Sequence, residues 1–477
     1  MNVFENFRKA LVGKSLTSNL QAGMIGKGVS IPGPFGSKPL IYADYVASGR
    51  ALAQVENFIN NQVLPFYANT HTEASFCGAY STRLREAART EIAKLVGADT
   101  AHSVIFAGGG ATAAINRLVA LLDLPRIVDK GGDAVVLVGP YEHHSNILPW
   151  RESGAKVIEI PEASSGGPDL LALEKALQAE TKAVIVVGAF SAMSNVTGIA
   201  TDTDAVTSCL KRYGALAIWD FAGGAPYIEM EMGHGRYAKD AIVFSPHKFP
   251  GGPGASGVLV LRNDIAQRNQ PTQSGGGTVR FVSPWGHHYL ENLVQREEAG
   301  TPNIIGDIRA ALVMMIKSAL GQQWFDRRHT ELRAQAVEAW KNARGLQLLG
   351  DQHIARVPIF SFQIRDEDNN LFHHQYITRL LSDLHGIQAR GGCACAGPYA
   401  HRLLHIEKAT SDDLLRNILA GNEVEKPGWV RLNLSALHNE KEIHKIINAV
   451  ANLAEDAKMY AQDYGMDTKN ARFHAIA

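Results

Sequence analysis

The sequence predicts an α/β protein with a seven-stranded, mostly parallel sheet in a large domain and a smaller α+β C-terminal domain. Of its 477 residues, 45% are hydrophobic and 20% charged, a balance typical of globular domains with a sizeable core. Short apolar runs alternate with helical patterns, as expected of a sheet covered by helices on both faces. The runs are Val104–Phe106, Ala134–Val138, Lys156–Ile160, Ala183–Val187, Ala215–Trp219, Asp240–Phe244 and Gly257–Leu261.

Helices are predicted between several of these runs. A glycine turn leads into Ala113–Leu122, and Asp169 can begin a helix over Leu170–Leu177. Leu84 and Val96 belong to the apolar face of an earlier helix. This alternation of strand and helix is what favours a parallel sheet.

The pattern changes after about residue 302. Ile304–Leu320 and Trp324–Ala343 have the apolar spacing of long helices, Val357–Ile364 is predicted as an isolated strand, and Trp429–Leu434 as the last strand. A final helix follows, which Asn439 can cap together with a glutamate three residues later. These elements predict the second, α+β domain.

The expected organisation has three parts. Residues 1–38 form an N-terminal arm, 39–303 the large domain, and 304–477 the small domain. Residues 399–428 resemble an insertion whose conformation the sequence does not define.

Composition limits the classes of partner. Forty-seven basic residues balance 47 acidic ones, so no broad electrostatic attraction to nucleic acid or to an anionic membrane is expected. No stretch reaches the length of apolar residues that a bilayer requires, and the first residues lack the apolar region of a signal peptide. Four cysteines in so long a chain suit a reducing compartment. We therefore expect a cytoplasmic protein that contacts neither nucleic acid nor membrane.

Polar residues that follow the strands are the candidates for chemistry, because ligands bind at the carboxyl ends of parallel strands. After the first run, Gly110, Ala111 and Thr112 end a glycine turn that can present backbone N–H groups and a hydroxyl to a phosphate. A flexible turn with a helix cap is the alternative. Asp220 follows the fifth run, where a lone aspartate is usually a helix cap.

The sixth run is followed by Ser245-Pro246-His247-Lys248 and a glycine-rich segment. Taken alone, Lys248 would be a solvated loop residue, and His143, which follows the second run, a surface or core histidine. Pyridoxal 5'-phosphate, however, needs a lysine for its aldehyde, a carboxylate for its pyridine nitrogen, a phosphate cradle and a flat group over its ring. Lys248, Asp220, the glycine turn and His143 supply these in order. The combination predicts a pyridoxal-phosphate enzyme.

Motifs spread along the chain resemble the class V aminotransferase superfamily of fold-type I pyridoxal enzymes, and most of all its cysteine desulfurase and selenocysteine lyase group. The resemblance runs from about Tyr42 to Leu453. It is carried by Tyr42-Ala43-Asp44-Tyr45-Val46-Ala47-Ser48-Gly49, Glu142-His143-His144-Ser145-Asn146, Ser194-Asn195-Val196-Thr197-Gly198, Asp220, Ser245-Pro246-His247-Lys248, Gly300-Thr301-Pro302-Asn303, Arg390-Gly391-Gly392-Cys393-Ala394-Cys395-Ala396-Gly397-Pro398 and Val430-Arg431-Leu432-Asn433-Leu434-Ser435.

The resemblance implies roles for the cofactor residues. Lys248 would hold the cofactor as a Schiff base and move the substrate's α proton, while Asp220 keeps the pyridine nitrogen protonated. Asn195 would lie near the cofactor's phenolic oxygen. The phosphate would be held by Thr112, Ser245 and His247.

The resemblance also implies which residues bind the substrate and which reach a partner subunit. Arg431 would bind the substrate carboxylate with its planar fork. Thr301 resembles a threonine that reaches the phosphate of a neighbouring protomer, which implies a homodimer.

Cys395 aligns with the desulfurase nucleophile and would take sulfur from L-cysteine, or selenium from selenocysteine, releasing alanine. A persulfide there could pass to a sulfur-acceptor protein. Arg390 and Arg431 are candidates for positive charge near the thiolate.

Cys393 leaves two alternatives open. It could be a resolving thiol for Cys395, or the pair could contribute two ligands to a metal. The metal alternative is disfavoured, because two cysteines supply only half of a structural zinc site, although His401 and His405 lie downstream. We expect no metal.

Three departures from the family pattern keep the reaction open. Gly223 replaces the usual Gln or His three residues after the aspartate, Ala113 replaces a frequent Glu, and the insertion at 399–428 follows the nucleophile. The alternatives are another pyridoxal reaction, either C–S β-elimination or transamination with Cys395 incidental, and a non-catalytic scaffold of this fold.

Overall fold

The computed structural model describes residues 3–70 and 72–476. The chain divides into two compact units. Unit 1 comprises Met1–Gly23, Ser48–Met193 and Thr201–Gln322, and unit 2 comprises Met24–Ala47, Ser194–Ala200 and Gln323–Ala477.

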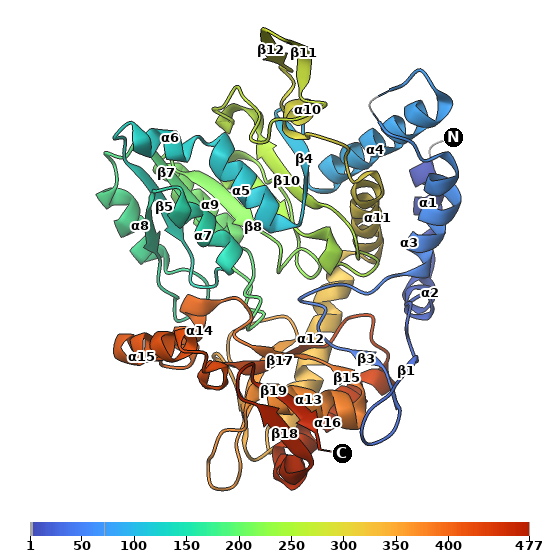
Figure 1. The fold of residues 1–477 in the computed structure, drawn as a ribbon, viewed down its shortest axis with the longest axis vertical. Coiled ribbons are helices and arrows are strands. Elements are labelled where there is room, and N and C mark those ends of the chain that lie inside the picture. Colours follow the sequence, from blue (N-terminus) through green and yellow to red (C-terminus); the bar gives the residue numbers. More distant parts are fainter. Residues whose placement is uncertain (1–2, 71, 477) are drawn as a thin grey trace. The chain divides into compact units, whose positions relative to one another are not determined.

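Unit 1 is built around the predicted seven-stranded sheet, whose order is β4-β10-β9-β8-β7-β5-β6 (Figure 1). Strand β10 runs opposite to the other six strands, which are all parallel to one another. The fold class is therefore confirmed. The strands are β4 (His102–Gly108), β5 (Ala134–Val138), β6 (Lys156–Glu159), β7 (Ile185–Ser191), β8 (Leu216–Asp220), β9 (Ala241–Phe244) and β10 (Gly257–Arg262).

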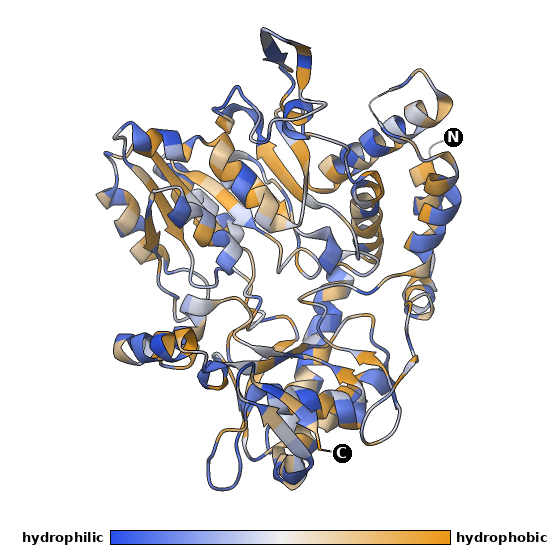
Figure 2. Cartoon of the chain, in the orientation of Figure 1, coloured by the Kyte–Doolittle hydropathy of each residue, from blue (hydrophilic) through white to orange (hydrophobic). Residues whose placement is uncertain are grey.

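The strands are largely hydrophobic, and the central ones are buried along their length (Figure 2). One apolar core lies between the sheet and helices of the unit, with Ile115 and Leu118 packed near Val136 and Trp150. The helices of this unit are α1 (Val3–Ala10), α2 (Leu16–Ala22), α3 (Ala53–Phe58), α4 (Phe76–Leu95), α5 (Ala111–Leu121), α6 (Leu124–Asp129), α7 (Leu148–Glu152), α8 (Leu170–Ala179), α9 (Thr203–Arg212), α10 (Leu293–Glu297) and α11 (Ile304–Leu320).

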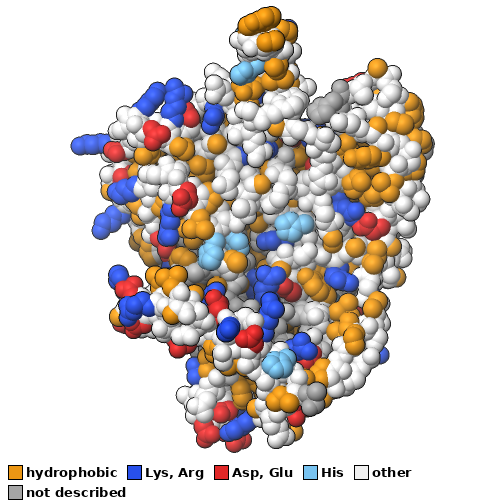
Figure 3. Space-filling view, viewed as in Figure 1, with side chains coloured by type: hydrophobic (Ala, Val, Ile, Leu, Met, Phe, Trp, Pro, Cys, Tyr) orange, Lys and Arg blue, Asp and Glu red, His pale blue; other side chains and the backbone are white. Residues whose placement is uncertain are grey.

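A hairpin of β11 (Val279–Ser283) and β12 (Gly286–Tyr289) projects from unit 1 (Figure 1). Its outer part carries exposed apolar side chains, of which Trp285 is 92% exposed (Figure 3).

Unit 2 contains a four-stranded sheet of order β13-β14-β17-β16. Its strands are β13 (Leu346–Leu348), β14 (Ile359–Ile364), β16 (Arg390–Gly392) and β17 (Trp429–Asn433). The expectation of an isolated strand is thus wrong, because β14 pairs with β13, which comes shortly before it in the chain, and with β17, which comes far after it. The helices are α12 (Gln322–Trp340), α13 (His374–His385), α14 (Gly397–Leu403), α15 (Lys408–Leu419) and α16 (Glu440–Asp456).

The predicted cap of the last long helix is present. The Asn439 side chain accepts from Glu442 N at 2.9 Å, and the Glu442 carboxylate accepts from Asn439 N at 2.9 Å. The apolar face of α16 is buried in the core of unit 2, where each such side chain contributes about 1.5–3 kcal/mol. Shorter strands complete the unit: β1 (Ser30–Ile31), β2 (Lys38–Pro39), β3 (Ile41–Tyr42), β15 (Ile387–Gln388), β18 (Tyr464–Asp467) and β19 (Arg472–Ala475).

The compact units differ from the expected domain ranges at two ends. Helix α11, expected in the small domain, packs against α4 within unit 1. The segment 24–47 belongs to unit 2, because β3 pairs in parallel with β15 and Asn433 N donates to Ala43 O at 2.9 Å. The segment 399–428 contains most of α14 and all of α15.

Candidate active site

The predicted site residues form two sets, one in each unit. In unit 1 they follow the carboxyl ends of neighbouring strands. Asp220 is the last residue of β8, where it is paired in register with Ser191 of β7 and Val243 of β9. Ser245, His247 and Lys248 come directly after β9, the last two within a short 3₁₀ turn.

Asp220 is buried at the carboxyl end of β8, the central strand of the sheet, and is 5% exposed. Its Oδ1 accepts a hydrogen bond from Ala222 N at 2.7 Å. Burial raises the pKa of Asp220, while this hydrogen bond and the charge of Lys248 oppose the rise.

The glycine turn after β4 contacts the segment after β9. Ala111 N donates to Ser245 Oγ at 2.9 Å, and Gly110 has a φ of 77°. A Cβ at Gly110 would lie 3.0 Å from His247 Cε1 and 3.1 Å from Ser245 Oγ, so only glycine leaves this concavity open. Burial and the nearby Lys248 charge lower the pKa of His247 to about 4, which keeps its ring neutral at pH 7.

His143 is held by its own loop. Its Nδ1 accepts from Ser145 N at 3.1 Å, which assigns the proton of a neutral ring to Nε2. Ser145 Oγ lies 2.7 Å from Thr112 Oγ1, so the His143 loop is linked to the glycine turn. Thr301 is exposed in the bend before α11.

A buried carboxylate under the His143 loop had no predicted role. Glu142 Oε1 accepts from Gly139 N at 3.1 Å and Ser191 N at 2.8 Å, and its Oε2 from Ser191 Oγ at 2.7 Å and Asn146 Nδ2 at 2.5 Å. Asn146 in turn accepts from Trp150 Nε1 at 2.9 Å. Burial raises the pKa of Glu142 to about 7, although the hydrogen bonds from Ser191 and Asn146 favour its ionised form. This network holds the residues on either side of His143.

Replacing Glu142 by glutamine is expected to destabilise the protein by about 1–3 kcal/mol, because an amide group would face donors. The pKa of Glu142 is raised above its ordinary 4.5, so its neutral form stabilises the fold at low pH. That contribution is lost as the pH rises from about 4.5 to about 7. The deficit of Glu142→Gln should therefore be largest below about pH 4.5. Urea denaturation at several pH values measures it.

The exposed Glu152, on α7, offers the matched control. Glu152→Gln should change the free energy of unfolding by less than about 0.5 kcal/mol at any of these pH values. Equal effects of the two variants would contradict the role of the Glu142 network.

In unit 2, Arg431 is the centre of the second set. Its side chain is buried, 3% exposed, on β17. NH2 donates to Asp44 Oδ1 at 2.8 Å and NH1 to the backbone oxygen of Asn195 at 3.1 Å. Its Nε is buried without a hydrogen-bond partner among the described residues. A buried donor of this kind needs an acceptor, which a carboxylate ligand would supply.

Asp44, another residue without a predicted role, joins two arginines. Arg390 and Arg431 are directly opposite each other in the β16–β17 ladder, where like charges repel. The two carboxylate oxygens of Asp44 separate them, since Oδ2 accepts from Arg390 Nε at 3.0 Å. The positive charge expected near Cys395 is therefore shared with Asp44.

Cys395 lies on a strained turn. Ala394 and Cys395 have φ values of 54° and 55°, and Ala396 N donates to Cys393 O at 3.1 Å. Two positive φ values inside a closed four-residue turn define type I′, which costs non-glycine residues about 1–2 kcal/mol each. The Asn195 side chain supports the turn by donating from Nδ2 to Ala394 O at 2.9 Å. Cys395 is exposed and Cys393 half-buried, and neither is in a disulfide.

The cysteine pair gains no histidine from the insertion. His401 Nδ1 lies 2.8 Å from Gly397 O and Nε2 2.9 Å from Ser411 Oγ, so both ring nitrogens already have hydrogen-bond partners. Among the residues that the structure describes, no three His, Cys, Asp or Glu side chains gather as metal ligands do. Across the same residues, no helix is long and apolar enough to span a bilayer.

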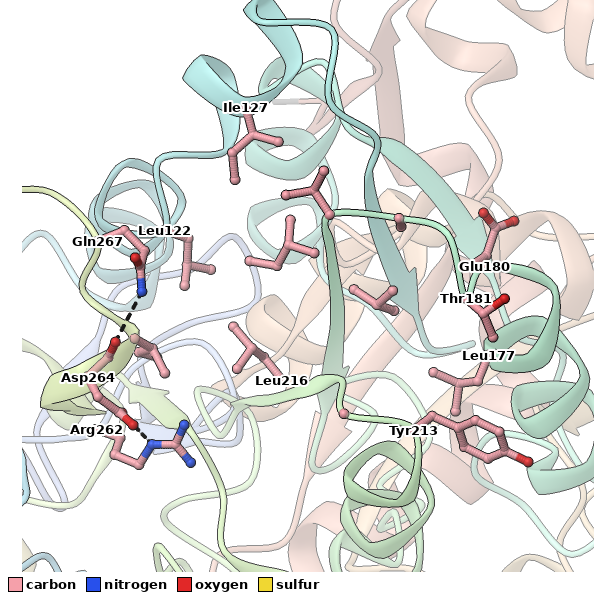
Figure 4. Close-up of a pocket in the computed structure, with 16 residues that line it drawn as sticks. Leu122, Ile127, Leu177, Glu180, Thr181, Tyr213, Leu216, Arg262, Asp264 and Gln267 are labelled. Atoms are coloured by element: carbon pink, nitrogen blue, oxygen red, sulfur yellow. Dashed lines mark hydrogen bonds and ion pairs between the residues drawn. The ribbon is translucent and has the colours of Figure 1, made fainter.

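A separate cavity of about 440 Å³ lies by the amino ends of β7 and β8, at the ends of these strands opposite to Asp220 (Figure 4). Leu177 and Leu216 form part of its apolar wall, and Arg262 donates to Asp264 at 2.5 Å on its rim. It contains none of the predicted site residues.

Comparison with known proteins gives the class. The model of the aminotransferase class V family matches residues 41–444. Relatives include the probable cysteine desulfurases of Vibrio cholerae, 30% identical, and of Halalkalibacterium halodurans, 27% identical. Each alignment covers 76% of this chain and 85% of the relative.

Solved structures share the fold. The cysteine desulfurase of Thermococcus onnurineus NA1 has a TM-score of 0.72 at 24% identity, covering 87% of this chain and 94% of that one. The cysteine desulfurase CsdA of Escherichia coli has a TM-score of 0.70 at 22% identity, covering 91% and 98%.

This chain belongs to the aminotransferase class V family, whose members are pyridoxal-phosphate enzymes with this α/β fold. The predicted family, enzyme class and cofactor are confirmed. The residues present suit that cofactor, because Gly110 leaves open a concavity beside Ser245 and His247. Asp220 supplies the buried carboxylate that a pyridine nitrogen needs.

Proposed function

We propose that this enzyme removes sulfur from L-cysteine, or selenium from selenocysteine, and releases alanine, with Cys395 as the first sulfur acceptor. The observation that carries the proposal is the exposed thiol of Cys395, held on a strained turn by Asn195, whose own backbone oxygen binds Arg431. The names of its relatives support the same reaction.

The cofactor residues would act from unit 1. Bound pyridoxal phosphate supplies an electron sink for the substrate's Cα. Thr112, Ser245, His247 and the turn formed by Gly110 and Ala111 would hold its phosphate. Asp220 would keep a proton on the pyridine nitrogen, and His143 would cover the ring.

The reacting residues would act on the amino acid itself. Lys248 Nζ would bind the aldehyde carbon before substrate arrives and then move the Cα proton. Arg431 would bind the substrate carboxylate, for which its buried Nε is open. The Cys395 thiolate would attack the substrate sulfur, so that the Cβ–S bond breaks and a persulfide forms on Cys395 Sγ. Asn195 would contact the cofactor's phenolic oxygen while supporting the turn.

The enzyme would also act with a second copy of itself and with a sulfur-acceptor protein. Thr301 would reach the phosphate of a second copy in a homodimer, and a sulfur-acceptor protein would take the persulfide sulfur from Cys395. We propose a cytoplasmic location from the reduced state that the chemistry of these thiols requires.

Product analysis tests the reaction. Cofactor-loaded protein is incubated with L-cysteine without added thiol, alanine and pyruvate are quantified, and Cys395 is examined by mass spectrometry. We expect alanine together with one added sulfur on Cys395, and neither with Cys395→Ser. Pyruvate with free sulfide in both proteins would instead establish β-elimination, and the absence of both products would direct the search to transamination.

Substituting Asp44 by asparagine is expected to raise the KM for L-cysteine about tenfold, about 1.4 kcal/mol, with a smaller change in kcat. The reason is that Arg431 and Arg390 would face each other without the carboxylate that separates and orients them. Steady-state alanine formation gives both constants.

Asp366 provides the control for Asp44. It is another largely buried carboxylate of unit 2, but it pairs with Lys458 and with the turn at Asn370. Asp366→Asn should leave the KM unchanged. A fall in kcat at constant KM for Asp44→Asn would show that Asp44 acts on the chemical step instead.

A further inference from the structure

The loop that bears Cys395 carries a second thiol in the same turn. Cys393 opens the type I′ turn and Cys395 is its third residue. Residues two apart cannot have Cα atoms further apart than about 7 Å. Cysteines joined directly through sulfur have Cα atoms about 4.4–6.8 Å apart, a range that this limit includes. The turn therefore keeps the Cα atoms of the two cysteines within about 7 Å of each other.

The two thiols differ in exposure. Cys395 is exposed, whereas Cys393 is half-buried beside β16. A sulfur atom carried by Cys395 is open to any thiol in solution, and one carried by Cys393 is partly shielded. The turn is also held from within, because Asn195 donates to Ala394 O between the two cysteines. Cys393 cannot drift away while Cys395 reacts.

We propose that Cys393 is a second sulfur carrier, which takes the persulfide sulfur from Cys395 and frees Cys395 for another turnover. This inference rests on the proposed function. The Cys393 thiolate attacks the outer sulfur of the Cys395 persulfide, and a new S–S bond forms at Cys393. The bond between that sulfur and Cys395 Sγ breaks, and Cys395 leaves as a thiolate that takes up the proton lost by Cys393. No external oxidant or reductant is needed.

Transfer to the outer sulfur suits this geometry better than formation of a disulfide. A Cys393–Cys395 disulfide would close a small ring across a turn whose backbone is already strained. The added sulfur extends the side chain of Cys395 by one S–S bond, about 2 Å, so attack on that outer sulfur does not close the small ring.

The burst of alanine tests the relay. Cofactor-loaded full-length protein receives excess L-cysteine without thiol, and alanine per chain is counted before turnover stops. Wild type should release two alanines per chain and carry sulfur on both Cys393 and Cys395. Cys393→Ser should release one and carry sulfur on Cys395 alone. Cys77→Ser, which removes a half-buried cysteine from α4, is the matched control and should behave as wild type.

Three outcomes would overturn the relay. One is a single alanine from both wild type and Cys393→Ser, with sulfur on Cys395 alone, which leaves the proposed function intact. Another is a single alanine with free sulfide and a Cys393–Cys395 disulfide, which would make Cys393 a resolving thiol. The third is obtained with a sulfur source other than L-cysteine, which makes the test independent of the proposed reaction.

That source is inorganic polysulfide, which adds sulfur to accessible thiols. The relay predicts that Cys393 acquires sulfur several-fold more slowly in Cys395→Ser than in wild type, because the exposed thiol is the point of entry. Equal rates would overturn it. If L-cysteine yields no alanine but polysulfide labelling of Cys393 still depends on Cys395, the proposed function fails while the sulfur transfer stands.

Discussion

Replacing Lys248 by alanine should lower the turnover of L-cysteine by at least about 10²–10⁴-fold, the contribution of a positioned proton-transfer group. Lys248 follows β9 in a short turn, and its charge opposes the rise that burial causes in the pKa of Asp220. The variant should also lose the visible absorbance of covalently bound cofactor. Absorbance spectra and alanine formation measure the two effects.

Borohydride reduction locates the covalent bond independently of turnover. In wild type, the cofactor should be fixed to the peptide that contains Lys248. The exposed Lys182 is the control, and Lys182→Ala should keep the absorbance, the labelled peptide and the turnover. Added methylamine should restore part of the activity of Lys248→Ala, since the missing group is an amine. Cofactor fixed to another lysine in wild type would refute the assignment of Lys248.

Glu298→Gln should lower the free energy of unfolding by about 3–5 kcal/mol, the cost of breaking a buried ion pair on one side. Glu298 accepts from Arg85 NH2 at 2.5 Å, from Arg89 NH1 at 2.8 Å and from Phe106 N at 2.8 Å. Arg85 also donates to Asp307 at 2.6 Å. Glutamine has nearly the shape of glutamate, but it would leave the buried Arg85 and Arg89 without the negative charge of Glu298. Chemical denaturation measures the loss.

The same arginines provide the control. Glu86 pairs with Arg89 at 3.0 Å, but its side chain is 53% exposed, so Glu86→Gln should cost no more than about 1 kcal/mol. Burial alone would raise the pKa of Glu298, yet the charges of Arg89 and Arg85 and the hydrogen bond from Phe106 hold it below its ordinary value. Its contribution is therefore present above about pH 4.5 and lost as the pH falls further. Equal losses in both variants would contradict this account.

Local patterns predicted the elements of the fold well, because each strand and helix depends on residues next to one another. Ile304–Leu320 coincides with α11, and all seven runs lie in the sheet. The run at Ala183–Val187 is displaced, since β7 continues to Ser191 through Gly188. A glycine weakens a strand pattern, but here Leu210 and Phe190 pack where its side chain would be.

Long-range contacts account for what the sequence did not predict. The family motifs predicted Asp220, Lys248 and Arg431 as site residues, because each of these residues stands in a recognisable stretch of sequence. Asp44 and Glu142 lay within the same motifs without a role, because a partner such as Arg431 is 387 residues away from Asp44. No local spacing reveals such a pair. The positive φ at Cys395 could not be predicted either, because no neighbouring residue type requires a left-handed backbone there.

The interleaving of the two units has a consequence for synthesis on the ribosome. Asp44 belongs to unit 2, yet Arg390, which it contacts, is made 346 residues later. At roughly 5–20 residues per second, the nascent segment 24–47 waits about 20–70 s before its partners emerge. During that interval the strand edge at β3 has no parallel neighbour. A chaperone that binds short extended segments would have this interval in which to bind the segment.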